Sequence, residues 1–269
     1  MIESGRMHRD FIKLSDRLMM SAAMVSRGSR IADVGCDHAH TDIWLVKEGI
    51  AESAIAMDVG EGPLSHALAN IDLYGLSDKI SVRLSDGLEN LKPGEADTVI
   101  IAGMGGTLMT LILDNGFEVM KTLDAVILQP QSDIWMVRRF LREHGFRITE
   151  ENMCIEEGKF YNSMKAVPTG GNVSVISDIK IKSASGELPY SCRGRDYELS
   201  DEQLTEDEFG RLLLERKDSV LKRLLEIMRK KNTAVLSEIT ANGGSGTEER
   251  RILFEREKVL LERAFDYYK

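Results

Sequence analysis

The sequence predicts an α/β protein: a mostly parallel sheet, closed by an antiparallel hairpin, that precedes a pair of long helices. Short apolar segments alternate with helical patterns over residues 30–144, which is typical of right-handed crossovers between parallel strands. Two more strand patterns flank a turn at residues 156–158, as in a β-hairpin. Because the pattern changes after this hairpin, we expect one domain over residues 1–167 and a second over residues 168–269.

Each element of the first domain has a local signal. The expected strands are short apolar runs, and glycines follow several of the helical segments. Pro63 suits the first turn of its helix, and Gly75 suits its end. The expected strands lie at residues 30–34, 54–58, 80–84, 97–102 and 125–128, the last broken by Gln129 and Pro130. The expected helices lie at residues 11–25, 41–48, 63–74, 107–113 and 134–144.

The remaining chain predicts a hairpin, an irregular stretch and two helices. The hairpin strands are expected at residues 146–155 and 159–167. No clear period follows until about residue 206, where an amphipathic helix begins that runs to about residue 241. A second helix is expected from Thr247 to about residue 268. The glycine-rich turn between them predicts an antiparallel helical hairpin or coiled coil.

Composition narrows the class of protein. A chain of 269 residues with 42% hydrophobic content has enough apolar material for a sizeable core. The three cysteines (Cys36, Cys154 and Cys192) are far apart, which argues against a structural zinc site or a disulfide framework and favours a reducing compartment. No apolar run reaches the ~18 residues that span a membrane. We therefore expect a cytoplasmic protein with no membrane partner. We also expect it to be a monomer.

Four short segments follow four successive strands of the expected sheet. They are Asp33–His38, Asp58 with Val59, Asp86 with Gly87, and Gly103–Gly106, which includes Met104 and Gly105. Ligands of open parallel sheets bind at the carboxyl ends of the strands, so a single pocket could collect all four segments. In that pocket Asp58 would accept hydrogen bonds from ribose hydroxyls, and Asp86 from an adenine amine. Gly35 would let the backbone approach the ligand closely.

The first of these segments argues against a pyrophosphate ligand. A dinucleotide-binding loop has a second glycine where this chain has Asp37. The carboxylate would repel a pyrophosphate but suits a ligand with a cationic amino-acid end. S-adenosylmethionine therefore fits better than NAD, and an NAD-dependent oxidoreductase is disfavoured. His38 and His40, only two residues apart, predict no metal site.

Several motifs resemble one enzyme family. They are Leu14-Ser15-Asp16-Arg17-Leu18, the run ADVGCDHAH at residues 32–40, IAGMGG at 101–106, ILQP at 127–130 and EGKFY at 157–161. The chain resembles the bacterial tRNA (adenine-22-N1)-methyltransferases, which are class I S-adenosylmethionine-dependent enzymes. The resemblance implies a Rossmann-like cofactor domain, followed by a helical domain that helps to hold tRNA.

The resemblance also implies roles for individual residues. Gly35, Asp37 and His38 match the family's first cofactor motif, and Asp58 stands where the family holds the ribose. Residues 103–106 match the motif beside the transferred methyl group and the target base. The chain departs from the family at residues 40–42, His-Thr-Asp, where many members have an aromatic residue and then a proline.

Catalysis itself needs little from the protein, because N1 of adenine has an available lone pair and the transfer depends mainly on positioning. Asp33 and Asp37 are candidates to stabilise the base as it becomes cationic, and His38 could relay a proton from the product.

The expected contacts with tRNA are Arg17, His40 and a basic run. Residues 211–231 carry eight lysines and arginines against three acids, a net charge of +5 that includes Arg229, Lys230 and Lys231. In an RNA methyltransferase such a run is expected to contact phosphates. Two alternatives stay open: a non-catalytic RNA-binding protein that keeps the fold, and a class I methyltransferase with another substrate.

Overall fold

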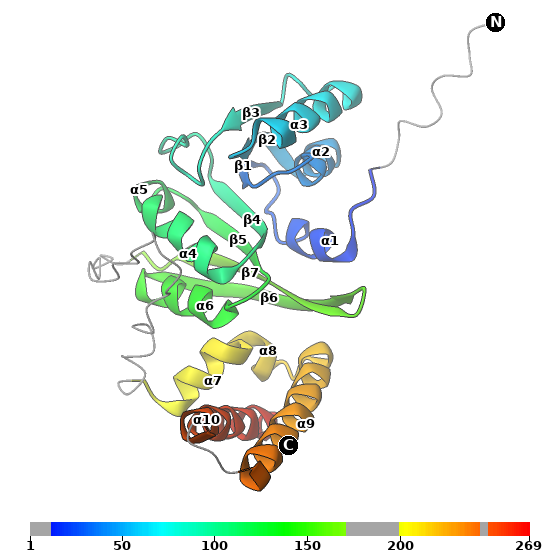
Figure 1. The fold of residues 1–269 in the computed structure, drawn as a ribbon. Coiled ribbons are helices and arrows are strands. Elements are labelled where there is room, and N and C mark those ends of the chain that lie inside the picture. The colour runs from blue at the N-terminus through cyan, green and yellow to red at the C-terminus, as the bar shows by residue number, and fades with distance from the viewer. Residues whose placement is uncertain (1–11, 171–198, 243–246) are drawn as a thin grey trace, which may run out of the picture. The chain divides into compact units, whose positions relative to one another are not determined.

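The computed structural model describes residues 12–170, 199–242 and 247–269 (Figure 1). The chain divides into two compact units, Met1–Ile176 and Ser177–Lys269. Within the described ranges, no helix combines the length and apolarity needed to cross a bilayer.

The first unit is built on one sheet of seven strands in the order β3-β2-β1-β4-β5-β7-β6. The strands are β1 (Ser29–Val34), β2 (Ala51–Asp58), β3 (Ile80–Leu84), β4 (Thr98–Met104), β5 (Ala125–Pro130), β6 (Phe146–Glu156) and β7 (Lys159–Pro168). The first five run parallel, while β7 is antiparallel to both of its neighbours. The predicted parallel sheet with a closing hairpin is therefore confirmed. The order in which strands are added to the sheet reverses at β1: β2 and β3 are added on one side of it, and β4 and β5 on the other.

Helices cover both faces of this sheet (Figure 1). On one face lie α1 (Asp16–Ala22), α2 (His40–Lys47) and α3 (Glu61–Tyr74); on the other lie α4 (Gly106–Asn115), α5 (Phe117–Met120) and α6 (Ile134–Glu143). Successive strand residues point to opposite faces of the sheet. Ile100 of β4 therefore packs in the core under α1, α2 and α3, and Ile101 packs in the core under α4, α5 and α6. This explains why the central strands are apolar throughout.

Several elements differ from the prediction. Strand β2 begins at Ala51, and β4 runs to Met104, so Gly103 and Met104 belong to the strand instead of following it. Helix α1 begins only at Asp16, because Ser15 has an extended backbone and residues 12–14 have no regular structure, although Leu14 is buried. Strand β5 continues through Gln129 and Pro130 instead of stopping before them, and Pro130 pairs with Met104 at the end of the ladder. The short helix α5 was not predicted.

In the second unit, the single helix expected over residues 206–241 is wrong. The chain forms α7 (Asp201–Phe209), α8 (Arg211–Glu215) and α9 (Ser219–Asn242) there instead. Gly210 and Lys217 interrupt the helix, since both have left-handed φ values (86° and 55°). Asp218 then caps α9 by accepting hydrogen bonds from the backbone N–H groups of Val220 and Leu221.

The predicted helical hairpin is confirmed between α9 and α10 (Thr247–Asp266). The Asn232 side chain of α9 donates hydrogen bonds to the Phe254 carbonyl and the Glu257 carboxylate of α10. Earlier in α9, the Arg229 guanidinium lies 4.1 Å from the ring centroid of Phe265, near the end of α10. The earlier residue of α9, Arg229, thus meets the later residue of α10, and Asn232 meets earlier ones, so the two helices are antiparallel. Most of the irregular stretch expected after the hairpin lies outside the described residues.

Candidate functional site

The candidate site is at the carboxyl edge of the sheet, beside the ends of the neighbouring strands β1 and β4. The backbone N–H groups of Gly35 and Cys36, just beyond β1, donate to the Met57 carbonyl of β2 at 2.8 and 3.0 Å. The Ser85 N–H, just beyond β3, donates to the Asp58 carbonyl at 2.9 Å. These bonds hold the turns after β1, β2 and β3 side by side, as expected for a ligand site where the strand order reverses.

A cavity of about 260 Å³ opens beside the end of β1. Its walls come from α1, from the turn between β1 and α2, and from the end of β4. The lining residues are Arg17, Leu18, Ser21, Asp33, Gly35, Cys36, Asp37, His38, His40, Thr41, Ile100, Ala102, Gly103 and Gln131. The structure thus brings together the predicted residues after β1 with Gly103, Arg17 and His40. Asp58, Val59, Asp86, Gly87, Met104 and Gly105 lie outside this lining.

The turn between β1 and α2 has an unusual backbone. Gly35, Asp37 and Ala39 have φ values of 76°, 52° and 56°, all in the left-handed region. Glycine adopts this conformation readily, whereas the other two residues hold it at a cost. The Asp37 side chain is 75% exposed at the cavity, so its carboxylate faces solvent and any ligand there.

Two buried acids lie side by side beneath this turn. Asp33 at the end of β1 is 6% exposed, and Asp42 in the first turn of α2 is fully buried. Burial, and to a smaller extent the charge of Asp58, raises the pKa of Asp33 to about 7, although a hydrogen bond with Asp42 opposes the shift. Burial and the neighbouring Asp33 raise the pKa of Asp42 well above its usual range. Sequence reasoning named Asp33 but gave Asp42 no role.

The same acids affect Cys36. Burial and then the negative charges of Asp42, Asp33 and Asp58 raise the pKa of its thiol. A protonated, buried thiol is a poor nucleophile, so Cys36 contributes packing at the cavity rather than covalent chemistry.

Three imidazole rings stack beside the cavity, and two of them, those of His38 and His40, line it. His38 lies between His40 of α2 and His66 of α3, with ring centroids 5.6 and 5.1 Å away and interplanar angles of 22° and 23°. Burial and the adjacent His38 lower the pKa of His40, outweighing the opposite effect of Asp37. His66 comes from another helix, and no local pattern in the sequence marks it as a partner of His38. Among the described residues, no group of three metal-ligand side chains is placed to hold an ion.

Arg17 is fixed in place at the cavity by two strands. Its guanidinium donates to the Gln129 side chain at 3.2 Å and pairs with the Glu156 carboxylate at 3.5 Å. Gln129, which is fully buried, also donates to the Arg17 carbonyl and to the Ser21 hydroxyl. These contacts tie α1 to β5 and β6, and explain why Gln129 continues the fifth strand.

Asp58 and Asp86 lie on the edge beside the cavity, at the ends of β2 and β3. The Asp58 carboxylate accepts a hydrogen bond from the Gly60 N–H at 2.8 Å, which orients it at the start of α3. Asp86 is exposed, whereas Gly87 is buried with φ 56° and a Cβ there would overlap Ile112. The next residue after Asp58, Val59, is 70% exposed.

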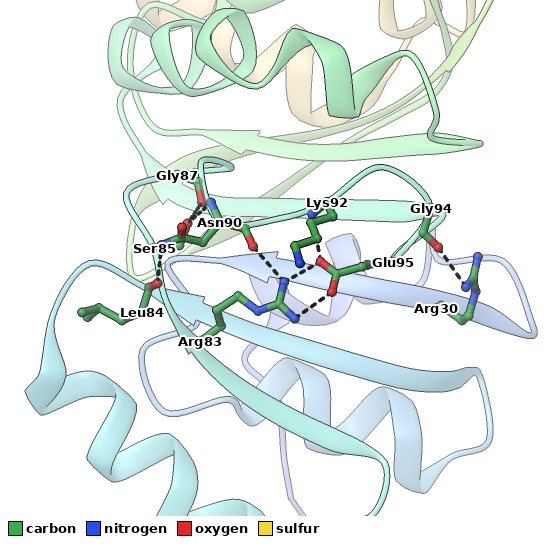
Figure 2. A network of polar contacts seen from close by, with 9 residues as sticks. All are labelled: Arg30, Arg83, Leu84, Ser85, Gly87, Asn90, Lys92, Gly94 and Glu95. Carbon is green, nitrogen blue, oxygen red and sulfur yellow. Dashed lines mark hydrogen bonds and ion pairs between the residues drawn. The ribbon is translucent and has the colours of Figure 1, made fainter.

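A polar network holds the loop that carries Asp86 (Figure 2). Arg83 of β3 donates to the Asn90 carbonyl at 2.8 Å and to the Glu95 carboxylate at 2.6 and 3.1 Å. The Ser85 hydroxyl bridges the Gly87 carbonyl and the Asn90 N–H. The hydrogen bonds from Arg83 and from the Lys92 N–H lower the pKa of Glu95 to about 2, so its carboxylate is charged at neutral pH.

The residues proposed to meet RNA in the second unit are solvent-facing. Lys230 and Lys231 are exposed on α9, and Arg229 is exposed while its guanidinium stacks on Phe265. They belong to a different compact unit from the cavity.

Comparison with known proteins identifies the first unit. Residues 14–164 match the family model described as a methyltransferase domain. The tRNA (adenine(22)-N(1))-methyltransferase of Bacillus subtilis is 37% identical over 155 residues, which are 58% of this chain and 65% of that protein. The ribosomal protein L11 methyltransferase of Syntrophomonas wolfei is 33% identical over 131 residues, which are 47% of this chain and 41% of that protein. The chain thus spans less than two thirds of the length of these relatives.

Solved structures extend the similarity to nearly the whole chain. The B. subtilis M1A22 tRNA methyltransferase TrmK has a TM-score of 0.77 at 27% identity, covering 94% of this chain and 99% of that one. A Streptococcus pneumoniae candidate tRNA (m1A22) methyltransferase, solved with S-adenosyl-L-methionine, has a TM-score of 0.71 at 28% identity with the same coverage. These matches confirm the predicted fold. The chain belongs to the methyltransferase domain family.

Proposed function

We propose that this protein transfers the methyl group of S-adenosylmethionine to N1 of an adenine in tRNA, at position 22. The observation that carries the proposal is the cavity beside the ends of β1 and β4, lined by Asp33 and Asp37, in a chain of the methyltransferase family. The similarity to the B. subtilis enzyme named for this reaction supports the choice of substrate. In this proposal residues 1–167 form the catalytic domain, and residues 168–269 help to hold tRNA.

The residues at the carboxyl edge fit the donor. Asp33 and Asp37 present carboxylates at the cavity, which suit a ligand with a cationic end and oppose a phosphate. Asp58 would hold the ribose hydroxyls, with Val59 beside it, and Asp86 with Gly87 would meet the adenine. His38 and the backbone of residues 103–105 complete the proposed contacts.

Bound S-adenosylmethionine supplies an electrophilic methyl group. The protein's part is to hold the adenine in line with it, since N1 needs no base to release its lone pair. Asp37, whose carboxylate is exposed at the cavity, would stabilise the positive charge that develops on the base. His38, whose imidazole nitrogen lies 3.5 Å from that carboxylate, would relay a proton from the methylated product.

The RNA must deliver an unstacked base to this cavity, as enzymes that act on bases require. His40, in the imidazole stack beside the cavity, offers an aromatic face for the flipped base. Arg17 would contact the adjacent backbone, and Arg229, Lys230 and Lys231 of α9 would neutralise phosphates. A tRNA substrate implies that the protein acts in the cytoplasm.

The proposal is tested by incubating the full chain with methyl-labelled S-adenosylmethionine and unmodified tRNA. We expect label in N1-methyladenosine, and mapping of the modified nucleotide should place it at position 22. A control tRNA with guanosine at this position should stay unlabelled. Label in another RNA or in protein would indicate a different substrate. Binding of tRNA without binding of the donor in calorimetry would favour a non-catalytic RNA-binding protein.

A further inference from the structure

The second buried acid, Asp42, is not explained by the cofactor contacts proposed above. It lies in the first turn of α2 with a fully buried side chain, and neither of its carboxyl oxygens has a hydrogen-bond partner by the geometry of the described residues. Its neighbour is the Asp33 carboxyl, which is also buried. Two ionised carboxylates have no proton to share, so a hydrogen bond between them requires that one be protonated.

The groups around the pair favour this proton. From β2, Asp58 adds a further negative charge, and the Cys36 thiol in the turn is neutral. The nearby cation from α1, Arg17, is already paired with Glu156. Strand β4 contributes only apolar walls. Helix α3 packs against this region with apolar side chains and also brings His66 against His38. The Asp37 carboxylate, in the turn after β1, lines the cavity but is largely exposed. His38 and His40 line the cavity, and the pKa of His40 is lowered, which keeps its imidazole neutral near pH 7.

We propose that Asp33 and Asp42 share one proton in the ligand-free protein and that the cationic methyl donor displaces this proton when it binds. The inference rests on the proposed function. In the step, the O–H bond of the shared carboxylic acid breaks, its electron pair stays on the carboxylate, and the proton leaves to the buffer. No bond of the donor changes. Asp42 does not line the cavity, so it is a positioning residue that acts through Asp33.

The physical basis is that the positive charge of the donor replaces the positive charge of the proton beside the two carboxyl groups. Two carboxyl groups in one buried site cannot both ionise cheaply, and an opposite charge nearby removes this obstacle. Asp33 lines the cavity, so a cation there lies close to the pair. Because the complex holds fewer protons than the free protein, donor affinity rises with pH. Release of one proton corresponds to about a tenfold gain per pH unit. This slope applies well below the raised pKa of the pair, and it decreases as pH approaches that pKa; the donor's own amino group stays charged throughout.

The test is calorimetric titration of the full chain with S-adenosylmethionine at pH 6.5, in PIPES and in imidazole buffers. These buffers take up protons with different enthalpies, so the difference in heat counts the protons released. We expect a large fraction of one proton for the unaltered protein, since pH 6.5 lies just below the raised pKa of Asp33. Asp42→Asn keeps the shape but removes the second acid, so release should fall toward zero and the pH dependence should flatten. Glu48→Gln, at the exposed end of the same helix, should behave like the unaltered protein.

Donor binding without proton release in the unaltered protein overturns this inference and leaves the proposed function standing. Unchanged release in a folded Asp42→Asn variant does the same. If no donor binds at any pH, the proposed function fails, and this inference with it. Should Asp42→Asn not fold, infrared spectra of the unaltered protein decide the matter. A protonated carboxyl band that disappears on addition of donor supports the inference, and its persistence overturns it.

Discussion

At the scale of single residues, the turn between β1 and α2 concentrates features that cost stability. Asp37 and Ala39 hold left-handed backbone conformations without being glycine, and Asp33 and Asp42 bury two acids together. Such features persist where the surrounding structure enforces them, and they gather at functional sites. Here they coincide with the cavity that we assign to the donor.

The buried pair should make stability depend on pH. The pKa of Asp33 is raised from 3.8 to about 7 in the folded protein, so folding retains a proton that the unfolded chain loses near pH 4. The free energy of unfolding therefore decreases as pH rises from about 4 to about 7. Asp42→Asn should weaken this decrease and stabilise the first unit at pH 8 by about 1–3 kcal/mol.

Urea unfolding at pH 5 and pH 8 measures this effect. Tryptophan fluorescence reports on the first unit alone, because both tryptophans, Trp44 and Trp135, lie there. Glu48→Gln should change stability by less than about 0.5 kcal/mol at either pH. A variant Asp42→Asn that is less stable than the unaltered protein at pH 8 would contradict the prediction.

Asp58 carries the second residue-level prediction. Its carboxylate is oriented by the Gly60 N–H at the edge of the site. If it holds the ribose through charge-assisted bonds, Asp58→Ala should weaken donor binding by about 1–3 kcal/mol. Calorimetry with S-adenosylmethionine measures the change. Asp78→Ala, an exposed acid before the opposite end of β3, is the matched control. Equal affinities for the two variants would remove Asp58 from the site.

At the scale of elements, the loop between β3 and β4 depends on Arg83 for its shape (Figure 2). The Arg83–Glu95 pair is partly exposed, so solvent screens it. Arg83→Gln should therefore lower the free energy of unfolding by only about 0.2–1 kcal/mol. Because this loop carries Asp86, donor affinity should also fall, by up to about fivefold.

Lys121→Gln is the control for this variant, since it removes an exposed ion pair with Glu118 on α5. It should leave donor affinity unchanged. If Arg83→Gln lowers stability while donor affinity is unaltered, the network serves the fold and not the position of Asp86.

The start of α4 is the second element-scale case. A Cβ on Gly106 would lie 2.6 Å from the Ser132 carbonyl oxygen, which is backbone and cannot rotate away. Gly106→Ala should destabilise the first unit by about 1–3 kcal/mol through overpacking. Gly62→Ala, in α3 with open space around the site, should instead stabilise by up to about 1 kcal/mol. Thermal unfolding followed by tryptophan fluorescence compares them, and equal effects would contradict the steric argument.

At the scale of the molecule, charge is unevenly distributed. The chain carries a net charge of −9, yet the exposed face of α9 includes Lys230 and Lys231. A local basic surface suffices for phosphates, because screening limits the reach of distant acids. We still expect a monomer, which size-exclusion chromatography with light scattering would check.

Reversing the charges of Arg229, Lys230 and Lys231 to glutamate should weaken tRNA binding and flatten its salt dependence, by up to about 0.9 in slope for each lost phosphate contact. Donor affinity should stay the same. The double variant of the two lysines leaves the stacking of Arg229 on Phe265 intact, so it separates charge from packing. The control is a double variant in which Lys79 and Lys121 of the first unit are changed to glutamate, which alters the net charge by the same amount. Equal tRNA affinities for these two double variants would leave the run as a solvated helix face.

Much of this protein is predictable from its sequence, because local patterns encode it. Apolar strands and helical periods predict the sheet, and acids at strand ends such as Asp33 and Asp58 predict the edge where a ligand would bind. Helix ends were harder: the pattern of apolar residues continues across Gly210 and Lys217, where only backbone geometry shows the breaks. Strand β5 passes through Gln129 because that side chain is satisfied by Arg17 and Ser21 of another element.

Patterns and motifs along the chain are thus enough for the fold class and the family, and they predict the edge at which the donor should bind. The tertiary structure alone decides which distant side chains meet. It places Asp42 against Asp33, His66 against His38, and Glu156 against Arg17. The reason is physical: burial, shared protons and ring stacking depend on distances across elements, and no spacing within a single segment encodes them.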